Sequence, residues 1–367
     1  MNTTIITFFL LLVSLCCPLT AQTPNNTEIV FGMSGSLSGH FSFYGNTIKG
    51  AIDACFAQAN DSGGIQGKKL RLICHDDHGD AQSTQNNIKK LHEKDGIDMF
   101  VGVMGTRGIL SLLPLIREQK IALFFPWGGD VALKDPNLTH IINGLGWLEP
   151  QLEVLSSHLV TTLRFKKVAI FHADDDFSSN AASALAQRLK DAGTTPLHVE
   201  QYNRFTMDIH TPAHQLMKVD PKLVICLSTS SPAVKLINYF FERGHFGTQF
   251  LGIDSTFLVP EILKNKGASF HFSSSVPNPQ TTDIPLAAAY KQALAQFTPD
   301  AEPSVLSFAY YISATILVRA LKNISGEITK EKIIQAIEAM RTFDLDGFSI
   351  NFNPNNRHIF GHKTWII

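Results

Sequence analysis

Short apolar segments alternate with amphipathic helical segments along most of this chain, and this alternation constrains its fold more than any other feature. The first unit begins with the apolar residues 29–34 and continues through the loop GSLSGHFSFYG into a helix predicted over residues 46–60. Apolar side chains recur in that helix at three- and four-residue spacing, so one face can pack on a sheet. The next apolar run starts at Lys69 and ends on two carboxylates. This layout predicts a βαβ unit whose first loop is a candidate binding site.

The alternation runs through two similar halves of the chain. It pauses around residues 141–151 and starts again with a helix predicted to end near Leu163, followed by the strand segment KKVAIFHADD at residues 166–175. Short, wholly apolar strands separated by helices are typical of parallel sheets that are covered on both faces. At 367 residues with 44% hydrophobic content, the chain is long enough to form two cores. We therefore predict an α/β fold with two doubly wound parallel sheets.

The composition changes in the C-terminal part. Residues 273–283, SSSVPNPQTTD, are rich in Ser, Pro, Asn and Gln, which indicates a crossing segment rather than a packed element. Helices are predicted over residues 285–297, 305–323 and 330–342, and the tail from Asp346 is predicted to form paired strands around an Asn-Pro turn.

The N-terminal segment predicts export from the cytoplasm. Residues 1–21 form an apolar run that ends on the small residue Ala21, as in a signal peptide cleaved before Gln22. The segment has no Lys or Arg, so an uncleaved anchor stays an alternative. Cys16 raises a lipid anchor as a further alternative, although Leu15 stands where a bacterial lipoprotein signal needs a small residue.

Charge and motifs exclude several classes of function. The formal net charge is −1, and no run of like charges marks a surface for nucleic acid or anionic lipid, so a small neutral or zwitterionic ligand fits better. No nucleophile elbow or phosphate loop is present, and we expect that the protein is not an enzyme.

His210 and His214 have a spacing that could bind zinc, but a four-ligand set is missing, so we expect neither metal nor cofactor. Cys55 and Cys74 could form a disulfide or remain buried free thiols.

Five motifs follow one another along the chain: the opening loop with Gly32, Ser38, Gly39, Tyr44 and Gly45, then NDSGGIQGKKL, HDDHGDAQ, VGVMGT and TQFLGID. In this order they resemble the periplasmic solute-binding proteins of branched-chain amino acid (Leu/Ile/Val-binding) ABC transporters. The resemblance implies a type I periplasmic-binding fold, in which two lobes are joined by three crossings and clamp the ligand. It implies a first lobe of residues 24–143 plus 276–346 and a second lobe of residues 144–275 plus 347–367.

The resemblance also assigns ligand contacts to loops of the first lobe. Tyr44 is expected to stand against the ligand, with an ordinary loop aromatic as the alternative. Thr106, which follows Gly105, matches the position whose hydroxyl helps to hold the ligand carboxylate. The same threonine could instead cap the helix that follows it.

The loop FFPWGGD departs from the family pattern. Amino-acid binders of the family usually carry a small residue and a threonine here, whereas this chain has Gly128, Gly129 and Asp130. Asp130 would repel a carboxylate if it faced the cleft, and it could instead cap the short helix that follows. Trp147 falls close to the first crossing between the lobes and could add a large apolar wall to the site.

In the second lobe, Phe177 matches the aromatic clamp position of the family, although it could equally be the apolar start of a helix. Thr229 follows the strand KLVICL, where relatives use an aromatic or a hydroxyl. Asp254 ends the motif QFLGID, where the acidic residue of the family binds the ligand ammonium. Helix capping is the competing role for Asp254.

The resemblance therefore predicts a periplasmic, monomeric substrate-binding protein. It would capture an amino acid or a related small zwitterion and deliver it to an inner-membrane ABC permease. The alternative is a sensor of the same fold, for an amino acid, an amide or urea, that signals to a membrane receptor or kinase. The sequence leaves both roles open.

Overall fold

Five parallel strands form the sheet of the first lobe, in the order β2-β1-β3-β4-β5. The computed structural model describes residues 27–367 except residues 130, 145–147, 160–164, 264–269, 356 and 362. The predicted signal peptide, Asp130 and Trp147 therefore lie outside the described residues. The strands of this sheet are β1 (Glu28–Gly35), β2 (Lys69–Asp76), β3 (Met99–Val101), β4 (Ala122–Phe124) and β5 (Ile141–Ile142).

Helices follow the strands of this lobe, as the alternation predicts. They are α1 (Ser42–Asp61), α2 (Ala81–Glu93), α3 (Thr106–Ser111), α4 (Leu113–Arg117) and the 3-10 turn η1 (Val131–Lys134). The first helix begins at Ser42, four residues before the predicted start at Asn46. The last part of the predicted loop is therefore the first turn of α1, and Tyr44 is a helical residue rather than a loop residue.

The second lobe contains a six-stranded sheet in the order β14-β10-β9-β8-β6-β7, parallel except for β14. Its strands are β6 (Val168–Ala173), β7 (His198–Tyr202), β8 (Leu223–Leu227), β9 (Gln249–Gly252), β10 (Phe270–Ser274) and β14 (Trp365–Ile366). Its helices are α5 (Leu148–Ser157), α6 (Asp176–Asp191), α7 (His210–Lys218), α8 (Ser230–Phe241), η3 (Asp254–Thr256) and α9 (Val259–Leu263). The α/β fold with two parallel sheets is thus confirmed.

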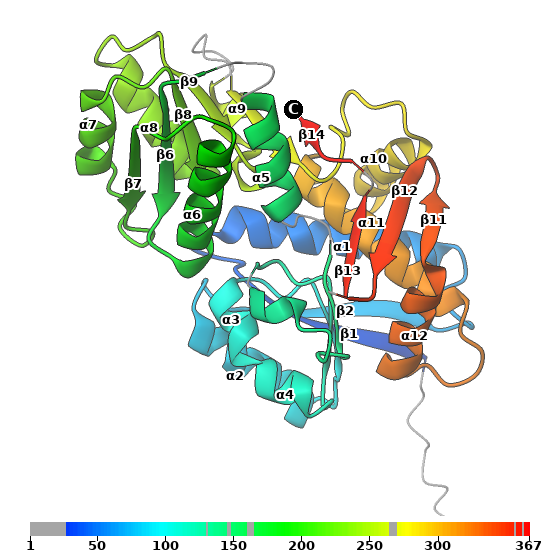
Figure 1. The fold of residues 1–367 in the computed structure, drawn as a ribbon. Helices are drawn as coiled ribbons and strands as arrows, with labels where there is room; N and C mark the ends of the chain where they lie inside the picture. Colours follow the sequence, from blue (N-terminus) through cyan, green and yellow to red (C-terminus); the bar gives the residue numbers. More distant parts are fainter. Residues whose placement is uncertain are drawn as a thin grey trace, which may run out of the picture.

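The C-terminal segments return to the first lobe before the chain ends in the second. The helices α10 (Pro285–Phe297) and α11 (Val305–Lys322) pack on α1, and α12 (Lys330–Met340) packs on α11 (Figure 1). The strands β11 (Thr342–Leu345), β12 (Phe348–Asn353) and β13 (His358–Gly361) form a separate antiparallel sheet. Of the tail predicted to join the second lobe, only β14 pairs with the sheet of that lobe.

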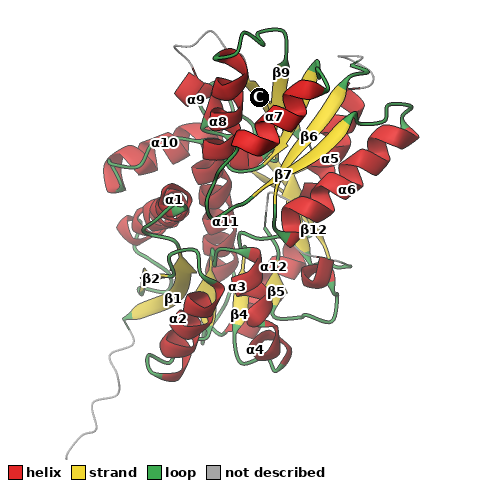
Figure 2. Ribbon diagram, turned by 90° about the vertical axis from the view of Figure 1, so that its left-hand side faces the viewer, coloured by secondary structure: helices red, strands yellow, loops and turns green. Residues whose placement is uncertain are grey.

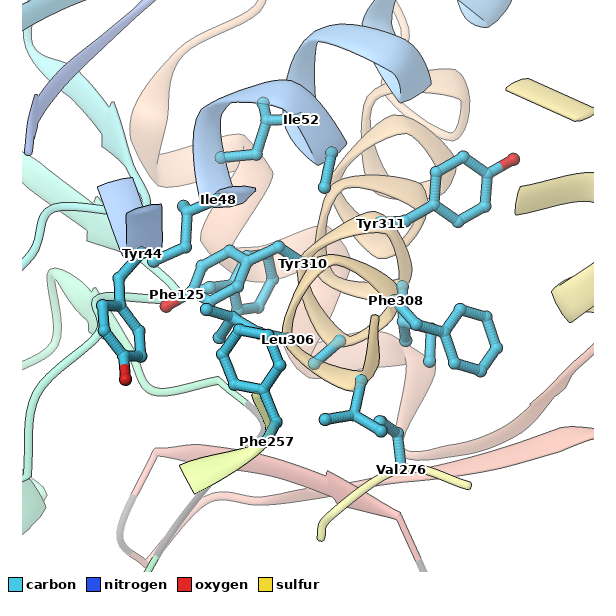
Figure 3. Close-up of a cluster of buried hydrophobic side chains, with 14 of the residues drawn as sticks. Tyr44, Ile48, Ile52, Phe125, Phe257, Val276, Leu306, Phe308, Tyr310 and Tyr311 are labelled. Atoms are coloured by element: carbon cyan, nitrogen blue, oxygen red, sulfur yellow. The ribbon is translucent and has the colours of Figure 1, made fainter. Parts of the chain in front are cut away.

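One hydrophobic cluster joins the two lobes at the level of α1 and α11. Figure 2 shows these two helices between the sheet of the first lobe and that of the second. Tyr44 and Ile48 of α1 lie there near Phe257, which follows η3, and near Leu306 and Tyr310 of α11 (Figure 3). Burial of one such large side chain contributes about 1.5–3 kcal/mol.

The helix α11 has the length and the hydropathy of a membrane span, with a mean hydropathy of 1.3 over 18 residues. However, 83% of this stretch is buried inside the protein, as in the core helix of a two-lobed domain. Its N-terminus is closed by a capping box, in which Ser304 and Ser307 satisfy each other's main-chain N–H groups. This helix is therefore a central element of the core.

The cysteines of the described chain are free thiols. Cys55 and Cys74 do not form a disulfide, and Cys226 is buried in β8. The Sγ atom of Cys55 lies 3.6 Å from the hydroxyl of Thr315 in α11. Burial raises the pKa of the Cys55 thiol to about 12, so this thiol is unreactive at neutral pH.

Candidate functional site

A cavity of about 720 Å³ lies between the two lobes. It is lined by segments that follow the carboxyl ends of parallel strands, which is where open α/β sheets bind ligands. The first lobe contributes residues that follow β1, β2, β3, β4 and β5, and the second lobe contributes residues that follow β6, β7, β8 and β9. Among the described residues, the alternation of strands and helices thus brings nine strand ends to one cleft.

Most of the predicted site residues line this cleft. They are Gly105, Thr106, Gly128, Phe177, Thr229 and Asp254. Asp130 and Trp147 lie outside the described residues, so their predicted roles stay predictions. Tyr44 is not among the lining residues, because its ring is buried behind Trp127, on which it stacks at 5.2 Å between ring centroids.

Thr106 organises the first-lobe wall of the cleft. It is the first residue of α3, and Gly105 rather than Thr106 occupies the N-cap position. The Thr106 hydroxyl accepts a 3.2 Å hydrogen bond from the main-chain N–H of Gly129. Gly128 packs so tightly on this turn that a Cβ atom there would lie 2.7 Å from a side-chain carbon of Ile109. The two strand-end loops therefore form one continuous polar wall.

The second-lobe wall contacts the first lobe at Phe177, which lies in the first turn of α6. Its ring is so close to Gly129 that a Cβ atom there would lie 2.5 Å from it. Asp175 caps α6, because its carboxylate accepts a 2.9 Å hydrogen bond from the Ser178 N–H. Thr229 occupies the N-cap position of α8, but its side chain makes no capping hydrogen bond. The lobes are thus in contact around the cleft.

Asp254 is the first residue of η3, and its side chain does not cap that turn, whose N-cap is Ile253. Gln151 of α5 holds it in place twice. The Gln151 amide donates a 2.8 Å hydrogen bond to the Asp254 carboxylate, and the Asp254 N–H donates a 3.0 Å hydrogen bond to the Gln151 carbonyl. Among the described residues, no Lys, Arg or His forms an ion pair with this carboxylate. Removal from bulk water raises the pKa of Asp254 to about 7.

Ion pairs between charged residues that line the cleft connect the two lobes. Lys134 and Glu149 are 2.6 Å apart, and Arg107 lies 3.9 Å from Asp176. Each such solvent-exposed pair contributes about 0–1 kcal/mol. These charges are therefore already paired within the protein.

The sequence did not predict two residues of the site: Gln151, which supports Asp254, and Arg204, which lines the cleft. Gln151 lies on the same helical face as Leu148, Leu152 and Leu155, and a buried amide on an apolar face was the available signal. Arg204 follows β7 and lines the cleft, but nothing in the sequence YNRF marks it as a site residue. Across the described part of the chain, no group of three His, Cys, Asp or Glu side chains is arranged to hold a metal ion.

The two-lobed fold and the cleft at its strand ends define a solute-binding protein that encloses a small ligand between lobes. The family model described as periplasmic binding protein matches residues 28–367. The chain belongs to this family, the type I periplasmic binding proteins that serve ABC transporters outside the cytoplasm. The members of this family are substrate-binding proteins rather than enzymes.

Individual relatives are distant in sequence. The chain is 23% identical to Leu/Ile/Val-binding protein homolog 3 of Brucella melitensis over 173 residues, which are 47% of each chain. The match thus spans about half the length of the first curated relatives. The structure superposes on a possible leucine/isoleucine/valine-binding protein from Rhodopirellula baltica with a TM-score of 0.84, at 25% identity over 94% of this chain and 95% of that one. It also superposes on a branched-chain amino acid ABC transporter protein from Thermus thermophilus with bound valine, with a TM-score of 0.82, at 19% identity over 92% of each chain.

Proposed function

We propose that this protein captures an amino acid or a related small zwitterion in the interlobe cleft and delivers it to an inner-membrane ABC permease. The observation that carries this proposal is the Asp254 carboxylate. It lines the cleft, is held by Gln151 and has no cationic partner among the described residues. A ligand ammonium would supply the missing charge through a charge-assisted hydrogen bond.

The first lobe would bind the other end of the zwitterion. The N–H groups of Gly105 and Gly129 already donate to the Trp127 carbonyl and the Thr106 hydroxyl. Among the described residues, the main-chain N–H groups of Thr106 and Gly128 and the hydroxyl proton of Thr106 are therefore the donors left on this wall. These neutral donors suit a ligand carboxylate. Because the two ends of the ligand contact different lobes, binding would stabilise the closed arrangement of the lobes.

Two further considerations support a transport role. The family serves ABC transporters, and a relative of the same fold has been crystallised with valine. We propose that the protein acts in the periplasm as a monomer after its N-terminal segment directs export. The interaction with a permease then depends on the closed form, in which both lobes present one continuous surface.

Mass spectrometry of the protein purified under native conditions tests the proposal. We expect one small molecule with a primary or secondary amine, present at close to one copy per protein. Purification of the Asp254→Ala variant in parallel serves as the control and is expected to yield the protein without the ligand. A sugar, nucleotide or lipid retained equally by both proteins would contradict the proposal.

A further inference from the structure

A second unpaired charge lines the same cleft at its outer side. Arg204 follows β7, the edge strand of the second sheet, and its side chain lines the cavity. Its Nε atom is buried and has no hydrogen-bond partner. No carboxylate of the described residues forms an ion pair with its guanidinium. Arginine presents a planar fork that matches a carboxylate, so this side chain is suited to an anionic group of a ligand.

The surroundings of Arg204 hold it in place. Its guanidinium carbon lies 4.9 Å from the ring centre of Phe205 and 5.9 Å from the ring centre of Phe41, a residue of the first lobe. The main-chain N–H of Arg204 donates a 2.9 Å hydrogen bond to the Asp174 carboxylate. The side-chain oxygen of Asn203 accepts hydrogen bonds from the N–H groups of Phe205 and Thr206. The loop is therefore preorganised, which lowers the entropic cost of binding.

The other charged side chains that line the cleft are already engaged. Asp80 and Asp175 cap the helices α2 and α6. His78 pairs with Asp76, and the remaining lining charges form ion pairs with one another: Arg107 with Asp176, and Lys134 and Arg188 with Glu149. Among the described lining residues, Arg204 and Asp254 are thus the two charges that neither form an ion pair nor cap a helix.

The positions of these two charges set the length of a ligand that contacts both. Asp254 follows β9 and Arg204 follows β7, and these strands are separated by β8 and β6. Three strand spacings give a distance of about 14 Å between the two strand ends. A single aliphatic amino acid bound to Asp254 by its ammonium group does not span this distance, because its carboxylate is attached to the same carbon as the ammonium group. The cavity volume of about 720 Å³ also lies in the range of drug-sized ligands rather than of the smallest metabolites.

We propose that the cleft takes an elongated zwitterion whose amino end contacts Asp254 and whose terminal carboxylate contacts Arg204, such as a peptide of two to four residues. An extended peptide covers about 3.3–3.6 Å per residue, which suits this span. In a peptide, the first carbonyl group takes the place at the Thr106 wall that the carboxylate of a single amino acid would occupy, so the ligand still contacts both lobes. This inference rests on the proposed function, because it assigns the ligand class of the same cleft.

Isothermal titration calorimetry with dialanine, trialanine, tetraalanine, their C-terminal amides and L-leucine tests the proposal. The wild type is expected to bind at least one peptide acid tenfold or more tightly than the matching amide and than leucine, because the amide lacks the charged group for Arg204. The Arg204→Gln variant is expected to lose this preference, and Arg204→Lys to retain part of it. Arg243→Gln, on the outer surface of the same lobe, is the matched control and should bind as the wild type does.

The outcomes separate this inference from the proposed function. Tight binding of leucine with equal affinity for wild type and Arg204→Gln would overturn the elongated ligand and leave the capture of a zwitterion intact. Equal affinity of wild type for peptide acids and amides would also overturn it. Absence of binding for every peptide would overturn the elongated ligand, whereas the capture of a zwitterion is decided separately by the molecule that co-purifies with the wild type.

Discussion

The hydroxyl of Tyr44 in the first lobe donates a 2.8 Å hydrogen bond to the main-chain carbonyl of Ser255 in the second lobe. The same hydroxyl accepts a 2.9 Å hydrogen bond from the N–H of Ser230, at the start of α8. The Tyr44 side chain is buried, and burial raises the pKa of its hydroxyl, so it remains neutral and available for both contacts. Tyr44 therefore connects the lobes directly behind the cleft.

The Tyr44→Phe substitution removes every interlobe hydrogen bond of the hydroxyl, including a 3.3 Å contact with the Ser230 side chain, and keeps the ring that stacks on Trp127. We expect the closed form to lose about 1 kcal/mol, with a several-fold loss of ligand affinity. Calorimetry and small-angle X-ray scattering measure the two effects. Tyr310→Phe is the control, since no described residue forms a hydrogen bond with its hydroxyl and the ring lies in the same cluster. An equal effect of both substitutions would contradict the role of the Tyr44 hydroxyl as a hydrogen-bonded link between the lobes.

Gly129→Ala places a methyl group 2.5 Å from the Phe177 ring and should prevent full closure of the cleft. We expect at least a tenfold loss of ligand affinity with little change in the unfolding temperature of the ligand-free protein. Gly247→Ala is the matched control, because a Cβ atom there meets nothing within 4 Å. Unchanged affinity of the Gly129 variant would show that the two loops separate when ligand binds.

Gln151→Leu removes both hydrogen bonds that position Asp254. The variant leaves the main-chain N–H of Asp254 without its partner, and we expect a loss of about 1–3 kcal/mol in the free energy of unfolding. Chemical denaturation measures this loss, and ligand affinity should fall about tenfold. Gln187→Leu is a suitable control, since among the described residues the Gln187 side chain bonds only the exposed Asp191 on the surface of α6. Wild-type ligand affinity in the Gln151 variant would show that Gln151 does not position Asp254 for ligand binding.

Ligand affinity should depend on pH through Asp254. Its pKa is about 7 in the ligand-free protein, and a bound ammonium lowers it, because the ammonium favours the ionised carboxylate. Affinity is therefore expected to be constant above pH 7 and to fall by up to tenfold per pH unit below it. Titrations from pH 5 to 8 measure this profile, which should be flat for Asp254→Asn. A fall in ligand affinity with rising pH would contradict the predicted direction of this dependence.

The stability of the ligand-free protein should show the opposite pH dependence. The folded-state pKa of Asp254 lies above its unfolded value of 3.8, so the folded chain binds more protons between the two values. This group therefore lowers stability as pH rises from about 4 to about 7. The unfolding temperature of the wild type should fall relative to that of Asp254→Asn over this interval, and a parallel course of the two proteins would contradict the raised pKa.

The arrangement of the cleft was largely predictable from sequence, because parallel strands place their carboxyl ends at one edge. Gly105, Thr106, Gly128, Phe177, Thr229 and Asp254 all follow predicted strands, and they line one cavity. The competing role of Asp254 as a helix cap is not observed, since Ile253 occupies that position. Sequence alone could not distinguish these roles, because both use a carboxylate at the start of a helical turn.

Contacts between distant parts of the chain were not predictable in the same way. Tyr44 was expected beside the ligand, but its hydroxyl partners are 186 and 211 residues away in sequence. Gln151 and Asp254 are separated by 103 residues. Such pairs depend on how the lobes pack, and local periodicity carries no information about that packing. The same limit explains why Arg204 was missed, since its significance comes from the absence of a described acidic partner.

Calorimetric titration of wild type and Asp254→Asn with one α-amino acid or peptide that binds the wild type tests the central claim most directly. The substitution keeps the shape of the side chain and removes its charge. We predict at least a tenfold loss of affinity at pH 8, together with loss of the proton release that accompanies binding near pH 7. Unchanged affinity and unchanged proton release would contradict the assignment of Asp254 as the group that binds the ligand amine.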